Sequence, residues 1–548
     1  MKKLIYIIGL MLALSSCDFL DTDVYGYLAD DNQLYRDEKS CMAGLTGVYD
    51  KLGSLGIYGE NIWCDLDAGT DILVYSANYN KDKILLFNNN YDNTDNTLKS
   101  TWKDLYEGIN RANDYIALID QRTDEECGGS IKKKMFQGEA RALRALYYMN
   151  LVAYWGAVPL RLEPTRDLSN QLLERSSQKD IYEKVIIKDL LVAAENCIPA
   201  DQLNSPGRIS QTTAWALLAR AYMWEAGYPV MANTWGEALK WARKVKESKL
   251  HRLYQDENGV NGYQALFINM CSDKYDLTYR ESMFEVEFAG NGLDKTNESG
   301  RVGLYLGIQQ TNLNDPDVPY AYGLFDGSKI LFRLYEDEDE RKWWNFAEYK
   351  YVTEGTKSVK MYYSEETNPK KSKLEDGKPG KWRAEYDPVR PWAKNCSSIN
   401  YPVMRYSDVL LMIAEAATEV AGGPTQEALD ALNEVRGRVK ASKIDLADLE
   451  SPDDFLTLIW EERTRELCFE VPRRMELRRH GENYYFDNIS LLKDQSQLEG
   501  GKMVGYVLTG SSAVKAVPAV NLAKKHLYFP IPQTELNTNP ICGQNPGW

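Results

Sequence analysis

The sequence predicts a mainly α-helical protein in which helical hairpins support an irregular, loop-rich region with a few short strands. Two observations predict this fold class. Apolar residues recur every three or four positions in long segments of both the N-terminal and the C-terminal parts of the chain. Between these parts, over residues 251–400, that periodicity gives way to short β-like runs, many Gly and Asn residues and charged patches.

The N-terminal part, residues 38–250, contains several segments with the apolar spacing of helices. They are residues 38–57, 98–120, 139–154, 178–195, 211–226 and 235–249. Two of them, Glu139–Tyr154 and Gln211–Ala226, share Ala-Leu-x-Ala or a near copy followed by Tyr-Met. Small Ala side chains on one face let a partner helix approach closely. The Ala residues expected at such contacts are Ala142, Ala145, Ala216 and Ala219.

The C-terminal part, residues 401–548, contains the clearest hairpin. Asp408–Val420 and Thr425–Val439 both have helical spacing, and the short turn at Gly422–Pro424 requires that they run antiparallel. Ser451 then begins another helix as its N-cap, followed by Pro and two acidic residues. Hairpins with Ala-rich contact faces resemble tetratricopeptide repeats (TPR), so we expect irregular TPR-like units.

The middle of the chain, residues 251–400, is predicted to be an insertion of loops and short strands. Its β-like runs are Met283–Phe288, Lys329–Leu334 and Ser358–Tyr363, and residues 364–385 form a long polar loop. Loops held by a rigid scaffold carry function more often than the scaffold does. We therefore expect the binding face in this insertion.

The first residues carry an export signal. Met1–Lys3 is positively charged, and the apolar stretch Leu4–Leu14 is too short to span a bilayer. Leu14-Ser15-Ser16-Cys17 resembles a lipobox, the cleavage and lipidation signal of bacterial lipoproteins. We therefore predict a signal peptide at residues 1–16, acylation of Cys17, and a lipidated tether over residues 17–37 that holds the protein at the membrane.

Composition argues against several classes of protein. Lys and Arg total 65 while Asp and Glu total 80, and the resulting charge of −15 does not suit a nucleic-acid partner, which requires a basic face. The cysteines after Cys17 are far apart and form no CxxC motif, which argues against zinc-ribbon and thioredoxin-type sites. Export permits disulfides, but a chain of this size does not require them, so their disulfide status is left open.

The sequence contains no recognisable catalytic set. There are three histidines, and HExxH, G-x-S-x-G, Walker and G-x-G-x-x-G motifs are missing. Glycosidases need only two carboxylates, but the acidic cluster from Glu461 to Glu470 is interleaved with Arg and is more typical of an ion-paired helix face. Asp65–Asp71 has calcium-loop character without the terminal Glu. We therefore expect no catalytic residue or cofactor and name no metal site, while whether a structural metal ion is bound is left open.

A series of motifs runs in order along almost the whole chain. The first is Cys17-Asp18-Phe19-Leu20-Asp21, and the last is Gln544-Asn545-Pro546-Gly547-Trp548. Between them lie Trp102-x-x-x-Tyr106, Gly138-Glu139-Ala140, Tyr154-Trp155-Gly156, Tyr401-Pro402-Val403-Met404-Arg405, Glu462-Arg463-x-x-Glu466-Leu467 and Pro530-Ile531-Pro532. Together they resemble the SusD/RagB family of outer-membrane lipoproteins of Bacteroidota. Val471-Pro472 departs from the family pattern, which usually has Gly then Arg.

This resemblance implies a fold of about four TPR-like units and a non-catalytic role at the cell surface. Such a lipoprotein captures a nutrient, most often an oligo- or polysaccharide, and delivers it to a SusC-like TonB-dependent transporter in the outer membrane. The implied location is the outer membrane, lipid-anchored and facing the exterior. Two alternatives stay open, namely a surface binder of peptides and a surface glycan hydrolase on the same helical scaffold.

Aromatic residues beside amides predict where a glycan binds. The flat C–H faces of sugars pack on aromatic rings, while amides and carboxylates bond the hydroxyl groups. The resemblance places an aromatic arc near residues 75–91 and 305–325. The candidates there are Tyr75, Asn78, Tyr79, Asn88, Tyr91, Tyr305, Asn312, Tyr320 and Tyr322. Trp343 and Trp344 are an alternative that could equally pack beneath the loops.

Overall fold

The structure is a computed structural model that describes most of the chain after the tether. The described residues are 34–75, 85–165, 172–290, 299–363, 377–449, 451–470, 472–495, 518–519 and 521–548. The predicted signal peptide, Cys17 and most of the tether lie outside these residues, as do Asn78 and Tyr79. The predictions about them therefore stay predictions.

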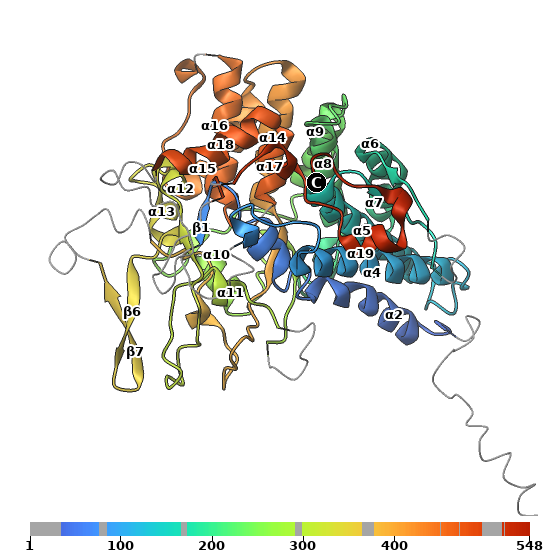
Figure 1. Ribbon diagram of the computed structural model, residues 1–548, viewed down its shortest axis with the longest axis horizontal. Coiled ribbons are helices and arrows are strands. Elements are labelled where there is room, and N and C mark those ends of the chain that lie inside the picture. The colour runs from blue at the N-terminus through green and yellow to red at the C-terminus, as the bar shows by residue number, and fades with distance from the viewer. Residues whose placement is uncertain are drawn as a thin grey trace, which may run out of the picture.

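Long helices form a continuous layer, shown in Figure 1, that winds from the N-terminal to the C-terminal part. They are α2 (Glu38–Asp50), α4 (Asn96–Ile119), α5 (Ser130–Trp155), α7 (Ile187–Asn196), α8 (Gln211–Ala226), α9 (Trp235–Glu247), α14 (Tyr406–Ala421), α15 (Gln426–Arg438) and α16 (Pro452–Leu467). Helix α4 packs on α5, α5 on α7, α7 on α8, α8 on α9, α9 on α14, and α14 on both α15 and α16. This succession of neighbouring hairpins confirms the predicted TPR-like fold.

Local sequence signals determine where these helices begin and end. Gly422 ends α14 in the left-handed conformation (φ 69°), and the Thr425 side chain accepts the backbone N–H of Ala428 at 3.1 Å to begin α15. Ser451 likewise accepts the N–H of Asp454 at 3.2 Å at the start of α16. The predicted hairpin and the predicted N-cap are both confirmed.

The helix faces expected at close contacts lie in the interior. Ala142 and Ala145 of α5 and Ala216 and Ala219 of α8 are fully buried. Gly108 of α4 lies directly against the ring of Tyr147 on α5, close enough that a Cβ at position 108 would stand 2.5 Å from two ring carbons. Small residues thus set how closely the helices of the layer approach.

The remaining helices lie outside this succession. The other helices are α6 (Gln178–Ile181), α10 (Gly262–Cys271), α11 (Val302–Tyr305), α12 (Lys329–Leu334), α13 (Glu340–Asn345), α17 (Arg473–Arg479), α18 (Glu482–Gln495) and α19 (Gln533–Thr538), with π-helical turns at Ile62–Leu66 and Tyr182–Ile186. The 3-10 turns are Lys51–Gly53, Ala200–Gln202, Ala384–Tyr386, Leu446–Asp448, Lys524–Leu527 and Pro540–Cys542.

The strands form antiparallel pairs. Strand β1 (Leu73–Tyr75) pairs with β5 (Phe325–Gly327), β2 (Val158–Pro159) with β3 (Arg175–Ser176), β4 (Ser282–Val286) with β8 (Tyr401–Arg405), and β6 (Tyr349–Glu354) with β7 (Lys357–Tyr362). Two of the predicted β-like runs are thus strands, within two residues of the expected bounds.

The third predicted run, Lys329–Leu334, is helix α12, so that prediction was wrong. The Ser328 side chain accepts the N–H of Leu331 at 3.2 Å and so caps the start of a helix. In this short segment the cap outweighed the β-like pattern.

The acidic and basic residues of α16 are ion-paired, as predicted, but they lie in the interior rather than on an open face. Arg405 of β8 bonds Glu281 at 2.8 Å and Glu466 at 3.0 Å, and Arg341 of α13 bonds Glu466 at 3.0 Å. Burial alone would raise the pKa of Glu462, but the guanidinium groups of Arg341, Arg465 and Arg436 lower it to about 2. We call this set (Arg341, Arg405, Glu462 and Glu466, with their partners) the buried ion network.

The Asp65–Asp71 segment also meets arginines. Asp67 accepts the backbone N–H groups of Arg473 and Arg474 at 2.6 and 3.0 Å. Asp71 bonds the Arg473 guanidinium through both oxygens, at 2.9 and 2.7 Å. Asp67 and Asp71 therefore attach the Asp65–Asp71 segment to α17.

Candidate functional site

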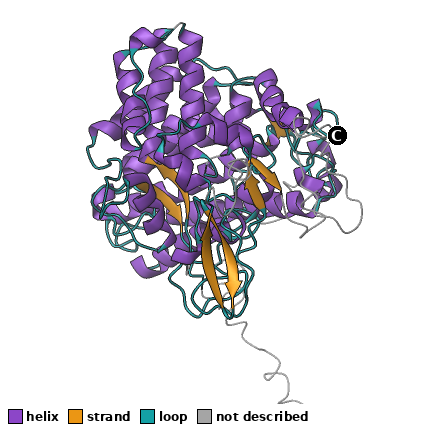
Figure 2. Cartoon of the chain, turned by 90° about the vertical axis from the view of Figure 1, so that its left-hand side faces the viewer, coloured by secondary structure: helices purple, strands orange, loops and turns teal. Residues whose placement is uncertain are grey.

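Among the described residues, the most exposed aromatic side chains, Tyr362 and Tyr275, lie in the irregular region. Figure 2 shows the β6–β7 hairpin projecting away from the helical layer. In its register Tyr349 lies opposite Tyr362, and their ring centroids are 5.3 Å apart. The base of this hairpin forms one wall of an open pocket.

We call this pocket the aromatic pocket, and its volume is 260 Å³. Helix α10 and the residue before it contribute two amides, α13 and the residues after it contribute two tryptophans and two carboxylates, and the hairpin contributes two tyrosines. The lining residues are Asn261, Gln264, Glu340, Trp343, Trp344, Glu348, Tyr349, Tyr362 and Arg383.

The aromatic rings of the pocket differ in how open they are. Tyr362 is 58% exposed and Trp343 is half-buried, whereas Trp344 and Tyr349 are buried. Trp344 is covered by the Arg383 guanidinium, whose carbon lies 3.5 Å from the ring centroid. The indole N–H of Trp343 donates to the carbonyl of Asp337 at 3.2 Å, which fixes that ring at the rim. Trp343 and Tyr362 are thus the rings that a ligand can reach.

Polar groups around these rings carry charges of both signs. Arg383 contributes the positive charge, while Glu348 and Glu340 contribute negative ones. Burial raises the pKa of Glu348, and nearby Arg383 opposes that rise. Glu340 forms an ion pair with Lys440 through one oxygen, and its other oxygen has no hydrogen-bond partner among the described residues. The pocket therefore offers both hydrogen-bond donors and acceptors beside the two accessible rings.

Three of the predicted tyrosines, Tyr305, Tyr320 and Tyr322, do lie together, but they lie outside the aromatic pocket. Tyr305 packs edge-on against Tyr322 at 5.3 Å, and Tyr322 packs edge-on against Tyr320 at 4.8 Å. Lys394 lies 4.8 Å from the Tyr320 ring centroid. Tyr305 and Tyr322 are buried and Tyr320 is half-buried, so this cluster offers one partly open ring.

The other described candidates do not join that cluster. Tyr75 is 1% exposed and packs against Phe325, while Tyr91 stacks on Trp548 with ring centroids 5.2 Å apart. Both rings belong to the core, so the expectation that they face a groove does not hold. Asn88 is buried as well, and the Asn312 amide donates to the carbonyl of Thr356 at the tip of the β6–β7 hairpin at 3.1 Å.

Sequence reasoning named Trp343 and Trp344 only as an alternative and missed the rest of the aromatic pocket. Tyr349 and Tyr362 follow strand alternation in β6 and β7, a pattern that could have marked them as cross-strand partners. Asn261 and Arg383 lie far away in the sequence, and no local pattern connects them to the hairpin.

A second groove, of 470 Å³, lies between the end of α2 and β4. Its carboxylates are Asp50, Asp273, Glu285 and Glu287. Of its rings, Phe284 and Phe288 are buried, Tyr49 is half-buried with its hydroxyl bonded to Glu139, and Tyr275 is 38% exposed. This groove therefore offers less open aromatic surface than the aromatic pocket, although it is larger.

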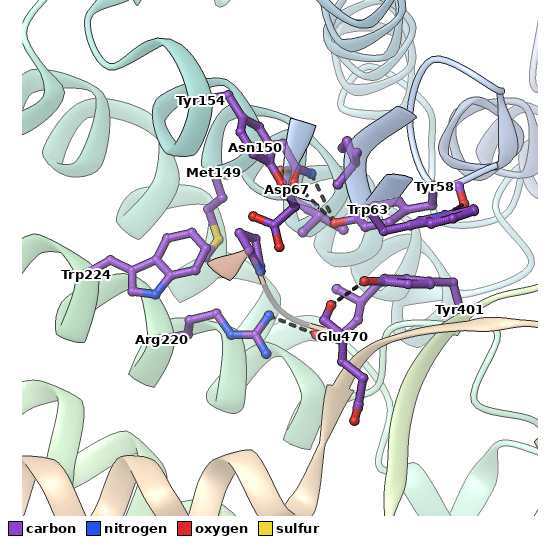
Figure 3. Close-up of a pocket in the computed structure, with 14 residues that line it drawn as sticks. Tyr58, Trp63, Asp67, Met149, Asn150, Tyr154, Arg220, Trp224, Tyr401 and Glu470 are labelled. Atoms are coloured by element: carbon purple, nitrogen blue, oxygen red, sulfur yellow. Dashed lines mark hydrogen bonds between the residues drawn. The ribbon is translucent and has the colours of Figure 1, made fainter. Parts of the chain in front are cut away.

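Figure 3 shows a third cavity, which lies between residues 58–67, α5, α8 and β8. Its volume of 20 Å³ admits about one or two water molecules and no sugar ring. Burial raises the pKa of Asp67 in this cavity to about 7, against the N–H groups of Arg474 and Arg473 that lower it. The cavity is therefore part of the core.

The described residues have two further properties that bear on function. None of their helices combines the length and apolar composition needed to cross a membrane. Nor do they gather three or more His, Cys, Asp or Glu side chains in a way that could hold a metal ion.

The fold and the pocket together define a class: a TPR-like helical scaffold that carries a loop-rich binding region. Residues 246–548 match the model of the SusD family, and residues 19–223 match a SusD-like model described as starch-binding and associating with the outer membrane. The first match alone covers more than half of the chain. This protein belongs to the SusD family.

Individual relatives agree with this assignment. Two SusD-like proteins of Formosa agariphila are each 25% identical to the chain, one covering 87% of this chain and 91% of its own, the other 98% and 97%. A solved SusD homologue from Bacteroides thetaiotaomicron is 27% identical with a TM-score of 0.81, covering 95% of this chain and 99% of that one. A laminarin-binding SusD-like protein shares the fold, with 23% identity, a TM-score of 0.67, and coverage of 94% and 100%.

Proposed function

We propose that this protein is a non-catalytic surface lipoprotein that captures a neutral oligo- or polysaccharide in the aromatic pocket. The observation that carries the proposal is the pair of accessible rings, Trp343 and Tyr362, in one pocket with amide and carboxylate groups. Membership of a family whose matching model is described as starch-binding supports it.

The chemistry of the pocket favours a sugar. Trp343 and Tyr362 can pack against the C–H faces of a sugar ring, and apolar contact of this kind does not require a charged ligand. Asn261 and Gln264 can both donate to and accept from hydroxyl groups. At 260 Å³ the pocket accommodates a short stretch of a chain and leaves the rest of a polymer outside.

The charges of the pocket favour a neutral glycan over a sulfated or uronic one. Arg383 is already stacked on Trp344 and donates to the carbonyls of Gly380 and Trp344, at 2.8 and 3.3 Å. Glu340 and Glu348 face the same space, and their carboxylates would repel an anionic chain. The same carboxylates can accept hydrogen bonds from sugar hydroxyls.

Replacing each accessible ring with Ala tests the site. Trp343→Ala and Tyr362→Ala should each weaken binding to a neutral polysaccharide by about 1–2 kcal/mol, or roughly 5- to 30-fold, because each removes a stacking face. Affinity electrophoresis against starch and laminarin, followed by calorimetry with oligosaccharides, measures the change.

Tyr320→Ala is the matched control, because it removes the half-buried ring of the predicted cluster without touching the aromatic pocket. If Tyr320→Ala weakens binding while the pocket variants bind as wild type does, the ligand lies on the Tyr320 cluster. Binding to peptides and to no glycan, or turnover of the polysaccharide by the purified protein, would favour one of the two alternative functions.

The anchor and the partner belong to the same proposal. We propose that Cys17 is acylated and holds the protein on the outer face of the outer membrane, because Leu14–Cys17 resembles a lipobox. We also propose that the captured glycan passes to a SusC-like TonB-dependent transporter, as the SusD resemblance implies. Affinity purification from native membranes should recover such a β-barrel, and its consistent absence would count against delivery while leaving glycan capture untouched.

A further inference from the structure

Two buried cysteines meet where the tether joins the folded body. Cys41 lies in α2, the first described helix, and Cys127 lies in the turn between α4 and α5. Both are fully buried free thiols, and they are close enough that each shifts the pKa of the other. The Cys41 sulfur also lies 3.9 Å from the carbonyl oxygen of Glu126, the residue before Cys127.

The surroundings hold these two segments together without any covalent bond. Arg36, just before α2, forms an ion pair with Glu126 in the turn. Glu38, the first residue of α2, bonds Lys132 near the start of α5 at 2.5 Å. The hydroxyl of Tyr115 on α4 donates to the carbonyl of Cys41 at 2.9 Å. The two cysteines therefore sit at the centre of a junction that is already closely packed.

We propose that Cys41 and Cys127 form a disulfide bond that fixes α2 to the α4–α5 turn in the exported protein. This inference rests on the export that the proposed function includes, since disulfides persist in the oxidising cell envelope and not in the cytosol.

The bond would form by thiol–disulfide exchange. One thiol loses its proton, and the thiolate attacks the disulfide of an envelope thiol–disulfide oxidoreductase to give a mixed disulfide. The second cysteine loses its proton and displaces that enzyme. Two thiols of this chain are thereby oxidised, and the oxidoreductase takes up the two electrons and two protons as a dithiol.

The burial of the two cysteines determines at which stage the thiol–disulfide exchange can occur. Removal from solvent raises the pKa of the Cys41 thiol to about 12 and also raises the pKa of Cys127, so the reactive thiolates are scarce once the junction has packed. The exchange therefore belongs to folding, before α2 docks. Once formed, the bond is enclosed and should resist dithiothreitol until the protein unfolds.

The position of the bond gives it a mechanical role. The predicted lipid anchor is at Cys17, so any pull between membrane and body enters the folded part through the residues just before α2. A cross-link at Cys41 would carry that force directly into the α4–α5 turn. The weaker ion pairs at Arg36 and Glu38 would then not bear it alone.

Counting free thiols tests the proposal. The full-length chain is isolated from membranes of an exporting host and denatured without reductant in iodoacetamide. Eight cysteines follow Cys17 in the chain, and we expect six of them to be alkylated. The peptides of Cys41 and Cys127 should be recovered joined, with a mass two hydrogen atoms below the sum of the two free peptides. Alkylation of all eight in membrane-isolated protein would overturn the proposal.

Two variants test whether the disulfide bond joins Cys41 to Cys127 and to no other cysteine. In Cys41→Ser every remaining cysteine, Cys127 included, should be alkylated, and protection of Cys127 in that variant would contradict the assigned pair. Cys271→Ser is the matched control, because Cys271 is equally buried but lies in α10, and it should keep the cross-link and lose one label.

A failure of export is distinguishable from a failure of the pairing. Cell fractionation shows directly whether the chain reaches the membrane. If it does not, the purified chain is unfolded and refolded in glutathione buffer containing oxidised glutathione. Formation of the Cys41–Cys127 peptide there supports the pairing, and two free thiols there overturn it.

Discussion

Gly108→Ala is a sharp test of how the helical layer is packed. Gly108 lies on α4 facing the ring of Tyr147 on α5, and a Cβ there would stand 2.5 Å from Cε1 and Cζ and 2.8 Å from Cε2. Tyr147 is fully buried, and its hydroxyl donates to the carbonyl of Val48 at 2.7 Å. The ring has no room to retreat without breaking that bond or shifting a helix.

The expected magnitude follows from opposing contributions. Replacing a helical Gly by Ala gains up to about 1 kcal/mol in helix propensity. Overpacking a closed core costs about 1–3 kcal/mol, and loss of the Tyr147 hydrogen bond costs about 1 kcal/mol more. We therefore expect Gly108→Ala to lower the free energy of unfolding by about 1–3 kcal/mol.

Gly47→Ala is the matched control. Gly47 also lies inside a helix, α2, but a Cβ there would have nothing within 4 Å. It should raise the free energy of unfolding by about 0.5–1 kcal/mol. Urea unfolding followed by tryptophan fluorescence measures both variants. If Gly108→Ala is as stable as the wild type or more stable, α4 and α5 are not packed as described.

Two other predictions concern the anchor and a buried acid. Cys17→Ala should release the protein from the membrane and leave it without lipid by mass spectrometry, and a variant that stays membrane-bound would refute the anchor. Burial raises the pKa of Glu285 to about 7, so the wild type loses stability as the pH rises from about 4.5 to 7. Glu285→Gln should therefore gain up to roughly 3 kcal/mol at pH 8 and little at pH 5, measured by urea unfolding. An equal difference at both pH values would contradict a protonated Glu285.

Elements of the fold could be predicted from the sequence where residues close in the sequence determine them. The α14–α15 hairpin could be predicted because Gly422 and Thr425 end and begin helices through their own backbone and side chain. The predicted segment Gln211–Ala226 is α8, and the Ser210 side chain caps its first turn. At Lys329–Leu334 the local pattern was ambiguous, and the Ser328 cap decided for helix.

The candidate site was less predictable because burial depends on distant parts of the chain. Tyr91 lies in an Asn-rich stretch that resembles an exposed loop, yet Trp548, more than 450 residues later in the sequence, stacks on its ring. The aromatic pocket likewise requires α10, α13, the β6–β7 hairpin and Arg383 to meet, and no spacing in the sequence encodes that meeting.

The buried ion network has a consequence for how the binding region can change. Arg341 is fully buried and held by Asp339, Glu462 and Glu466, while Trp343, two residues later, stands at the rim of the pocket. Substituting Arg341 would remove one of the guanidinium groups that compensate the buried Glu462 and Glu466, whereas Trp343 is half-buried and pairs with neither carboxylate. Ligand preference can therefore diversify at the rim while the charged residues beneath it keep the region docked on the helices. An isolated fragment of residues 251–400 would lack two of the three carboxylates that pair with Arg341, because Glu462 and Glu466 lie outside it.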